Sequence, residues 1–325
     1  MKTILSLIFA FVLITSMAQE RKWDPPKPPA TAKNGTITVI PINDAVTGAQ
    51  QLAETLTGPG ISISNIEFTG SIEGYQSGFF SNGMEAGLGI EEGIILSSGS
   101  VYNAQGPNTS NQISASLDLP GDADLSELAG FQTYDANILE FTFIPESDSV
   151  SIRFVFGSDE YLQYVNTQYN DVFAFFLNGE NIALVPATSQ PVTINTINHL
   201  INTQFFRNNS SSPYPFNIEA DGFTTVLTAL GAVAPGQDNT IKLAIADGGD
   251  QHIDSWVFLE AGSFTISNPN QDDPDDETGD GDDGSDDETD NDDDDPTPLP
   301  IGNSGILLAF AMMVLFTFLF MKKRI

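Results

Sequence analysis

Residues 139–156 read LEFTFIPESDSVSIRFVF, and this stretch decides the fold class. In residues 139–143, apolar side chains alternate with Glu140 and Thr142, and the same alternation returns in residues 150–156. A period of two places every second side chain on one face of an extended chain. Both segments are therefore predicted to be β-strands with one buried face.

Four further segments extend this pattern. Residues 172–177 (VFAFFL) and 182–185 are continuous apolar runs, as expected of strands covered on both sides, and Asn178-Gly179 between them is a hairpin signal. Residues 241–246 and 256–259 complete the set. Many short strands with turn residues between them predict an all-β protein, with a jelly-roll-like β-sandwich over residues 34–268.

One short helix is expected at the N-terminal end of this domain, from Asn43 to Leu56. Asp44 is placed to cap it, and Gly58-Pro59-Gly60 to stop it. The apolar stripe expected to face the core consists of Val46, Ala49, Ala53 and Leu56.

The N-terminal end of the chain predicts export. Residues 1–18 have the plan of a signal peptide, with Lys2, an apolar run from Ile4 to Ile14, and small residues before position 19. An uncleaved anchor is the alternative, although the run is short for crossing a bilayer. Residues 19–33 form a Pro- and Lys-rich lead-in to the domain.

The C-terminal end predicts a membrane tether. Residues 269–300 are expected to be a disordered acidic linker, since residues 271–295 hold 16 acidic residues and no basic one. Weak cation binding is the other interpretation of this segment. Residues 301–321 are predicted to form a transmembrane helix, followed by a basic cytoplasmic tail at 322–325. The same tail also fits a sorting signal that is cut and exchanged for another anchor. Either way, the domain is expected on the extracytoplasmic side, at the cell surface or in the periplasm.

Charge and cysteine content exclude several functions. The formal net charge is −33, and residues 34–270 contain 26 acidic but only 3 basic residues. Nucleic-acid binding is excluded, because phosphates need Lys and Arg partners, whereas cations are natural counterparts of such a surface. The chain has no cysteine, which removes thiol catalysis and disulfides.

Two acidic clusters follow predicted strands, at residues 157–171 and 247–255. If loops at one end of the sandwich bring them together, their oxygens would repel unless a hard cation neutralised them. Ca²⁺ fits this oxygen-rich inventory better than Zn²⁺ does. The alternative is that these side chains cap turns and accept backbone N–H bonds. The candidate Ca²⁺ ligands are Asp159, Glu160, Asp171, Asp247, Asp250 and Asp254.

Signals for an enzyme are weaker. His252 lies near Asp254 and Ser255, but neighbours in sequence rarely reach the geometry of a catalytic triad. A carboxylate pair for polysaccharide cleavage stays open, since many acids are present and none is singled out. His199 is interpreted as a surface residue. The polar segment 203–214 is read as a surface loop, or else a ligand-contacting one.

Nine stretches resemble the choice-of-anchor L domain of bacterial surface proteins. They run in order over roughly residues 50 to 265, at 121–125 (GDADL), 135–141 (DANILEF), 154–161 (FVFGSDEY), 170–173 (NDVF), 185–188 (VPAT), 191–196 (PVTINT), 221–224 (DGFT), 246–250 (ADGGD) and 254–260 (DSWVFLE). The departures are small: Ser-Asp-Glu-Tyr stands where Ser-Glu-Glu-Tyr is usual, and Trp256 where a small residue is common.

The resemblance implies an extracellular domain carried on one of several kinds of C-terminal anchor. It brings no established activity, substrate or catalytic residue. Two alternative functions are therefore expected. The first is a tethered surface domain for adhesion or for binding a glycan, a matrix component or a cell-surface protein. The second is a tethered polysaccharide hydrolase that works through paired carboxylates.

Overall fold

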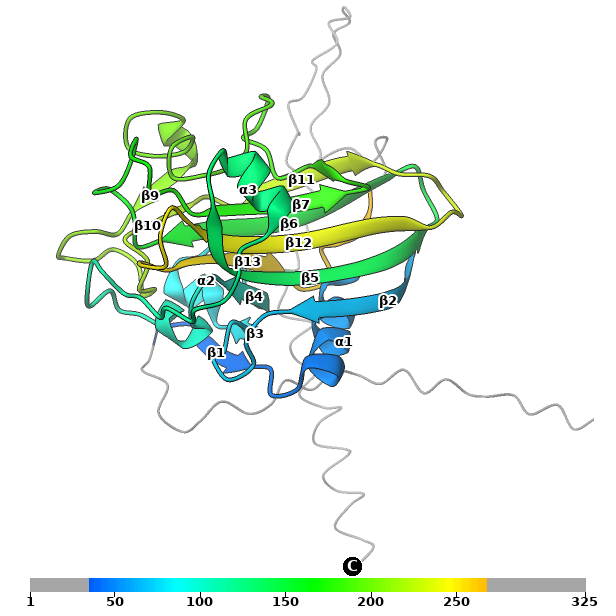
Figure 1. Ribbon diagram of the computed structural model, residues 1–325, viewed down its shortest axis with the longest axis horizontal. Coiled ribbons are helices and arrows are strands. Elements are labelled where there is room, and N and C mark those ends of the chain that lie inside the picture. The colour runs from blue at the N-terminus through cyan, green and yellow to red at the C-terminus, as the bar shows by residue number, and fades with distance from the viewer. Residues whose placement is uncertain (1–34, 268–325) are drawn as a thin grey trace, which may run out of the picture. The chain divides into compact units, whose positions relative to one another are not determined.

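The computed structural model describes residues 35–267, which form two β-sheets (Figure 1). The strands of the larger sheet are β1 (Thr38–Pro41), β3 (Ser77–Ser81), β4 (Gly93–Ser97), β6 (Ser149–Ser158), β9 (Phe206–Asn208), β10 (Gly222–Thr224), β11 (Leu227–Ala232), β13 (Ser255–Glu260) and β14 (Thr265–Ile266). Their order is β1-β3-β4-β13-β6-β10-β9, and β11 and β14 also pair with β6.

The second sheet has five strands in the order β2-β5-β12-β7-β8. They are β2 (Ile61–Thr69), β5 (Thr133–Pro145), β7 (Val172–Leu177), β8 (Glu180–Asn181) and β12 (Asn239–Gly248). The strand pairs of both sheets are antiparallel. The predicted β-rich, sandwich-like fold is confirmed, and the finer jelly-roll description stays a prediction.

The main core lies between the two sheets and is rich in phenylalanine. The period of two in β5 and β6 turns one set of side chains inward, and Phe141 and Phe154 are at most 1% exposed. The ring of Phe154 meets the rings of Phe173 and Phe175 on β7 edge-on, at centroid distances of 5.5 and 5.0 Å. Each such buried ring contributes roughly 1.5–3 kcal/mol over an exposed one, so this core needs no disulfide.

Helix α3 (Ala123–Ala129) covers the outer face of the second sheet, where it contacts β5, β7 and β12 (Figure 1). Leu125 is fully buried there against small side chains, among them Ala174 of β7 and Ala244 of β12. This contact explains why residues 172–177 are apolar at every position. The expectation that this strand is covered on both sides is confirmed.

Helix α1 (Ala45–Leu56) is the predicted N-terminal helix, and Asp44 caps it by accepting a hydrogen bond from the Thr47 backbone N–H at 2.7 Å. One detail of the prediction is wrong: Val46 is 82% exposed, and Leu52 is buried in its place. At 100° per residue, Val46 lies about 70° from the centre of the buried stripe, which is formed by Ala49, Leu52, Ala53 and Leu56.

Two further segments differ from expectation. The hairpin turn at Asn178-Gly179 is present, but the strand after it is β8, not residues 182–185. The Asn181 side chain ends the strand, because its Oδ1 accepts hydrogen bonds from the backbone N–H groups of Phe175 and Ala183. Within residues 203–214, η2 (Thr203–Phe205) and β9 replace part of the expected loop.

The remaining short helices are α2 (Gly83–Ala86) and η1 (Val101–Ala104). The predicted signal peptide, lead-in, acidic linker, C-terminal helix and basic tail lie outside the described residues. Within residues 35–267, no helix is both long and apolar enough to cross a membrane.

Candidate functional site

Four central strands bring the two acidic clusters together at one end of the sandwich. Ser158 at the end of β6 pairs with Ser255 at the start of β13, and Gly248 at the end of β12 pairs with Thr133 at the start of β5. The loops next to these strand ends therefore lie at the same end of the sandwich. The backbone N–H of Asp159, in the first cluster, donates a hydrogen bond to the carbonyl of Asp254 in the second, at 3.2 Å.

An extended segment crosses this end of the sandwich, and we call residues 109–119 the strap. Its N–H groups donate to buried carboxylates instead of strand carbonyls. Ile113 donates to Asp159 at 2.9 Å, Ala115 to Asp254 at 2.9 Å, and Leu117 and Leu119 to the two oxygens of Asp135 at 2.9 and 2.6 Å, while Thr109 and Ser110 donate to Glu219. From Ile113 to Leu119 the donors recur at every second residue, as expected of an extended chain.

These hydrogen bonds give Asp159 and Asp254 a structural task. Burial nevertheless raises the pKa of Asp159 to about 8, with the carboxylates of Asp221 and Glu219 adding to the rise. Burial also raises the pKa of Asp254 to about 6, against the N–H donors that favour its charged form. The alternative that the sequence left open, carboxylates accepting backbone N–H bonds, is therefore realised for these two residues.

Asp171 and Glu160, both in the first cluster, link it to the second cluster through hydrogen bonds. Glu160 accepts a hydrogen bond from the backbone N–H of Asp171 at 3.0 Å, and Asp171 accepts from the Gly248 N–H at 3.0 Å and the Ser255 hydroxyl at 2.7 Å. Burial raises the pKa of both carboxyls well above their usual range. The nearby charge of Asp171 raises the pKa of Glu160 further, and the charges of Asp254 and Asp250 raise that of Asp171. The Ser255 hydroxyl is thus bound to Asp171, and exposed His252 does not reach it, so the triad suggested by composition is not formed.

Asp247 stands apart from the other candidates. It is 1% exposed, and neither carboxylate oxygen has a hydrogen bond of normal geometry from the described residues. Burial raises its pKa well above the usual range, the charges of Asp171 and Asp254 raise it further, and the nearby Ser98 hydroxyl offsets part of this. An unpaired buried carboxylate costs several kcal/mol if charged, which makes Asp247 the least satisfied group of the site.

The six candidate ligands do not surround one point. Asp159 faces the strap and Asp221, Asp247 lies among Asp171, Asp254 and Asp135, and Glu160 and Asp250 line a pocket. Within residues 35–267, no group of three or more Asp, Glu or His side chains is arranged to hold a metal ion.

Sequence reasoning missed three buried acids of this end, Asp135, Glu219 and Asp221, together with the strap. Asp221 accepts a hydrogen bond from the Asn108 amide at 2.7 Å, and burial raises its pKa to about 6. A signal for the strap was present, because Ile113, Ala115, Leu117 and Leu119 alternate with polar residues.

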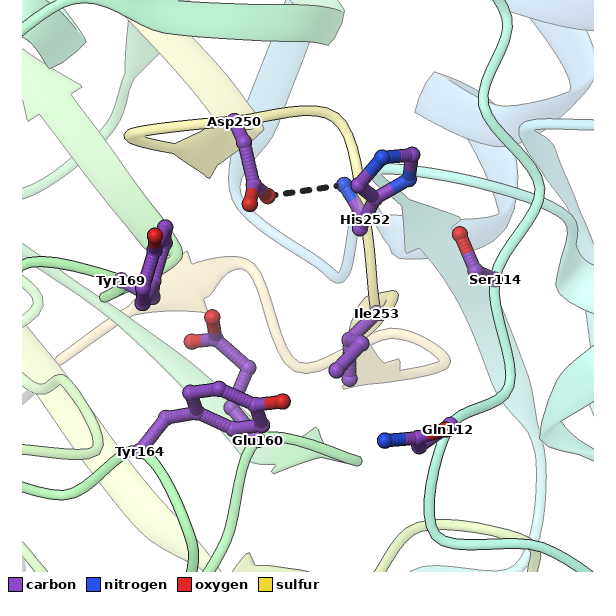
Figure 2. A pocket seen from close by; sticks show the side chains of 8 residues that line it. All are labelled: Gln112, Ser114, Glu160, Tyr164, Tyr169, Asp250, His252 and Ile253. Carbon is purple, nitrogen blue, oxygen red and sulfur yellow. Dashed lines mark hydrogen bonds between the residues drawn. The ribbon is translucent and has the colours of Figure 1, made fainter.

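A pocket of about 470 Å³ opens between the strap and the two clusters (Figure 2). We call it the tyrosine pocket, and its lining residues are Gln112, Ser114, Glu160, Tyr164, Tyr169, Asp250, His252 and Ile253. Gln112 and Ser114 come from the strap, in which the even-numbered residues from 112 to 118 are exposed and the odd-numbered residues from 113 to 119 are half-buried. In Figure 2 the carboxylates of Glu160 and Asp250 point toward one another between the tyrosines and the strap.

The walls of the tyrosine pocket are held in place by the fold. The rings of Tyr164 and Tyr169 meet at right angles, with centroids 5.8 Å apart. Asp250 accepts a hydrogen bond from the His252 backbone N–H at 3.0 Å. Ile253, in the second cluster, has φ 68°, which is strained for a β-branched residue. The strap holds the next residue in place, because the backbone N–H of Asp254 donates a hydrogen bond to the Ile113 carbonyl. Strain of this kind is found where the surrounding structure fixes a binding surface.

His199 and the segment 203–214 do not line this pocket. His199 is exposed, as expected. Phe206 is 9% exposed and packs on the ring of Tyr161 at 4.9 Å, so it is part of the core rather than of a ligand-contacting loop.

The fold and the loop-end carboxylates together define a β-sandwich domain with a polar pocket at one end. The chain belongs to the choice-of-anchor L domain family, whose model matches residues 41–265, more than half of the chain. Membership makes this a surface-associated protein, as the resemblance implied. No curated protein and no solved structure matched the chain.

Proposed function

We propose that this protein is an exported, membrane-tethered binding domain that holds a glycan or a similar polar ligand in the tyrosine pocket. The observation that carries the proposal is the lining of that pocket, where two tyrosine rings lie beside carboxylate, amide and hydroxyl groups. Aromatic rings receive the apolar faces of sugar rings, and convergent polar groups bind their hydroxyls. The strap and its carboxylates support a preformed pocket, which lowers the entropy cost of binding.

Adhesion to another surface follows from this placement. The predicted linker at 269–300 would hold the domain away from the membrane, and the predicted helix at 301–321 would anchor it. Protease treatment of intact cells tests the tether: the domain should be released, while a short C-terminal fragment stays with the membrane. If the C-terminal segment is instead a processed sorting signal, the mature chain will lack residues 301–325 by mass spectrometry.

We further propose that Ca²⁺ stabilises the domain at the loop-end carboxylates. Asp247 supports this, because its oxygens lack a partner and its neighbours Asp171 and Asp254 are also acidic. Carboxylate oxygens are the type of ligand that a hard cation takes, and backbone carbonyls and water would have to complete its shell, because the acids of residues 35–267 alone are not arranged around one point. The melting midpoint of the full chain should be several degrees higher in excess Ca²⁺ than in EDTA, since an ion bound only to the native state stabilises that state. An unchanged midpoint would end the calcium proposal and leave the pocket proposal intact.

A carboxylate-dependent polysaccharide hydrolase is the second candidate, favoured by one observation. Glu160 and Asp250 line the same pocket, and burial raises the pKa of Glu160 as a general acid requires. Incubating the full chain with polysaccharide panels from pH 4 to 9 distinguishes the two functions. Release of reducing ends that is lost in Glu160→Gln identifies a hydrolase, whereas binding without release identifies a binding domain.

The binding proposal is tested by screening the full chain against arrayed glycans and matrix components, with and without Ca²⁺. The proposal is supported if Tyr169→Ala loses the binding and Tyr102→Ala keeps it. Tyr102 is the control, since it is a half-exposed tyrosine that does not line the pocket. Silence on every ligand under both conditions would count against the proposal.

A further inference from the structure

The tyrosine pocket is acidic, and the charged form of Glu160, whose pKa burial raises, is favoured only when a cation lies beside it. Two of its lining residues are carboxylic acids, and none is Lys or Arg. The three basic residues of the domain are placed elsewhere: Arg153 pairs with Glu260 at 2.6 Å, Lys242 pairs with Asp122 and Asp124 at 2.7 Å each, and Arg207 lines a separate, smaller cavity. Apart from His252, whose ring Nδ1 lies 3.2 Å from the Ser116 hydroxyl, no lining residue is able to carry a positive charge, so the ligand is the main source of one.

Each pocket carboxylate keeps one oxygen available. Glu160 uses Oε2 to accept the Asp171 N–H, and Asp250 uses Oδ1 to accept the His252 N–H. Within residues 35–267, no hydrogen bond is formed to Glu160 Oε1 or Asp250 Oδ2. Figure 2 shows both carboxylates directed into the space between the tyrosines and the strap. An ammonium group has three N–H donors and no acceptor, which matches these acceptors.

The two tyrosine rings complete a site for a cation. Their interplanar angle of 89° makes a right-angled corner, in which a group next to one ring face also lies near the other. The faces of aromatic rings carry negative potential and attract cations within about 6 Å of the centroid, most strongly where water is excluded. Tyr164 and Tyr169 are half-buried, so the corner is partly shielded from water.

The strap side of the pocket has a different chemistry. Gln112 and Ser114 offer an amide and a hydroxyl, which suit the hydroxyls and ring oxygens of a sugar and carry no charge. One wall therefore suits an ammonium group, and the facing wall suits the uncharged part of a glycan.

We infer that the tyrosine pocket recognises a glycan with a free amino group, whose ammonium lies between Glu160, Asp250 and the corner of Tyr164 and Tyr169. The inference rests on the proposed binding function and names its ligand class. Neutral and N-acetylated sugars lack the cation that this wall requires, so the pocket discriminates by the charge of the amino group.

Titration calorimetry with the full chain tests this inference with two matched probes, the β-1,4-linked trimer of glucosamine and the same trimer of N-acetylglucosamine. We expect the amino trimer to bind at least tenfold more tightly. Glu160→Gln and Asp250→Asn should each weaken the amino trimer about tenfold and leave the N-acetyl trimer unchanged, because both variants keep the shape and remove the charge. Circular dichroism of each variant confirms that it is folded.

Glu180→Gln is the matched control, since it removes an exposed acid on β8, at the far end of β7 from the pocket. Equal or tighter binding of the N-acetyl trimer in the pocket overturns the inference and leaves the proposed function standing. If Glu180→Gln weakens binding of the amino trimer as much as the two pocket variants do, the trimer is attracted to the acidic chain as a whole. That result also overturns the inference. No binding of either trimer overturns the inference, and the proposed function then rests on the wider panel.

Discussion

Replacing Asp159 by asparagine is expected to flatten the dependence of stability on pH. In the native state, burial raises the pKa of this carboxyl from 3.8 to about 8. A raised native pKa means that the folded protein binds a proton that the unfolded chain releases, so stability is fully present below about pH 4 and is lost as the pH rises through about 8. Asp159 therefore makes the domain more stable in mild acid than in mild alkali.

The magnitude follows from the width of the pH window. Between pH 5 and pH 8 the native carboxyl keeps a proton that the unfolded chain has released, so the free energy of unfolding falls by about 1.36 kcal/mol per pH unit, or about 4 kcal/mol over the three units. Asp254 and Asp221, with pKa values of about 6, add in the same direction below pH 6 and stay in the variant. Asp159→Asn also loses a hydrogen bond to Ile113 or Asp221, which costs roughly 1–3 kcal/mol, largely independent of pH. The slope with pH, not the absolute stability, is the diagnostic quantity.

The assay is urea unfolding of the full chain in EDTA at pH 5, 6, 7 and 8, followed by tryptophan fluorescence, because Trp256 is fully buried. Wild type should lose about 4 kcal/mol or more of unfolding free energy between pH 5 and pH 8, and Asp159→Asn should lose about 4 kcal/mol less. Glu180→Gln, which removes an exposed acid, should keep the wild-type slope. A wild-type stability that is flat or rising over this range, or an unchanged slope in Asp159→Asn, would refute the reasoning.

Three further results are expected. Asp247→Asn should raise the melting temperature in EDTA, because it removes the cost of protonating a buried, unpaired carboxyl whose native pKa is raised, and it should abolish any rise caused by Ca²⁺; a Ca²⁺ shift of wild-type size would place the ion elsewhere. Asp135→Asn should cost roughly 1–3 kcal/mol and speed amide exchange at Leu117 and Leu119, and unchanged exchange there would show that Asp135 does not hold the strap. Leu125→Ala should cost roughly 2–5 kcal/mol without altering ligand affinity, since α3 covers the sheet away from the pocket, and a matching loss of affinity would argue against that separation.

Local patterns were sufficient for β5, β6, β7, β12, β13 and the N-terminal helix, but the remaining strands, such as β2 and β11, were not predicted. Alternation in residues 139–156 predicted β5 and β6, and Asp44 marked the start of α1. The face of α1 was partly misjudged at Val46, because spacing restricts an apolar stripe to about 100° but does not say which of its edges meets the sheet. The strand after Asn178-Gly179 was misplaced because the Asn181 side chain takes over the N–H of Phe175, a contact that depends on tertiary structure.

The location of the acidic residues at strand ends was predictable, but not which of them accept backbone N–H groups and which stays unpaired. The sequence placed the clusters at 157–171 and 247–255 at strand ends and left open whether they meet, and the structure brings them together. Which acid takes which task depends on the strap, whose residues lie some 40 to 140 positions away in sequence from the carboxylates of Asp159 and Asp254. A backbone N–H gives no sequence signal of its partner, so bonded carboxylates and the unpaired Asp247 look alike in the sequence.

We propose above all that the tyrosine pocket binds the ligand of this surface domain. The most direct measurement is the affinity of the full chain for its best glycan, compared between wild type and Tyr164→Ala/Tyr169→Ala, with Tyr102→Ala as the control. We predict a loss of at least tenfold in the double variant and none in the control, with melting temperatures that show all three proteins folded. Equal affinity of wild type and the double variant would contradict the claim.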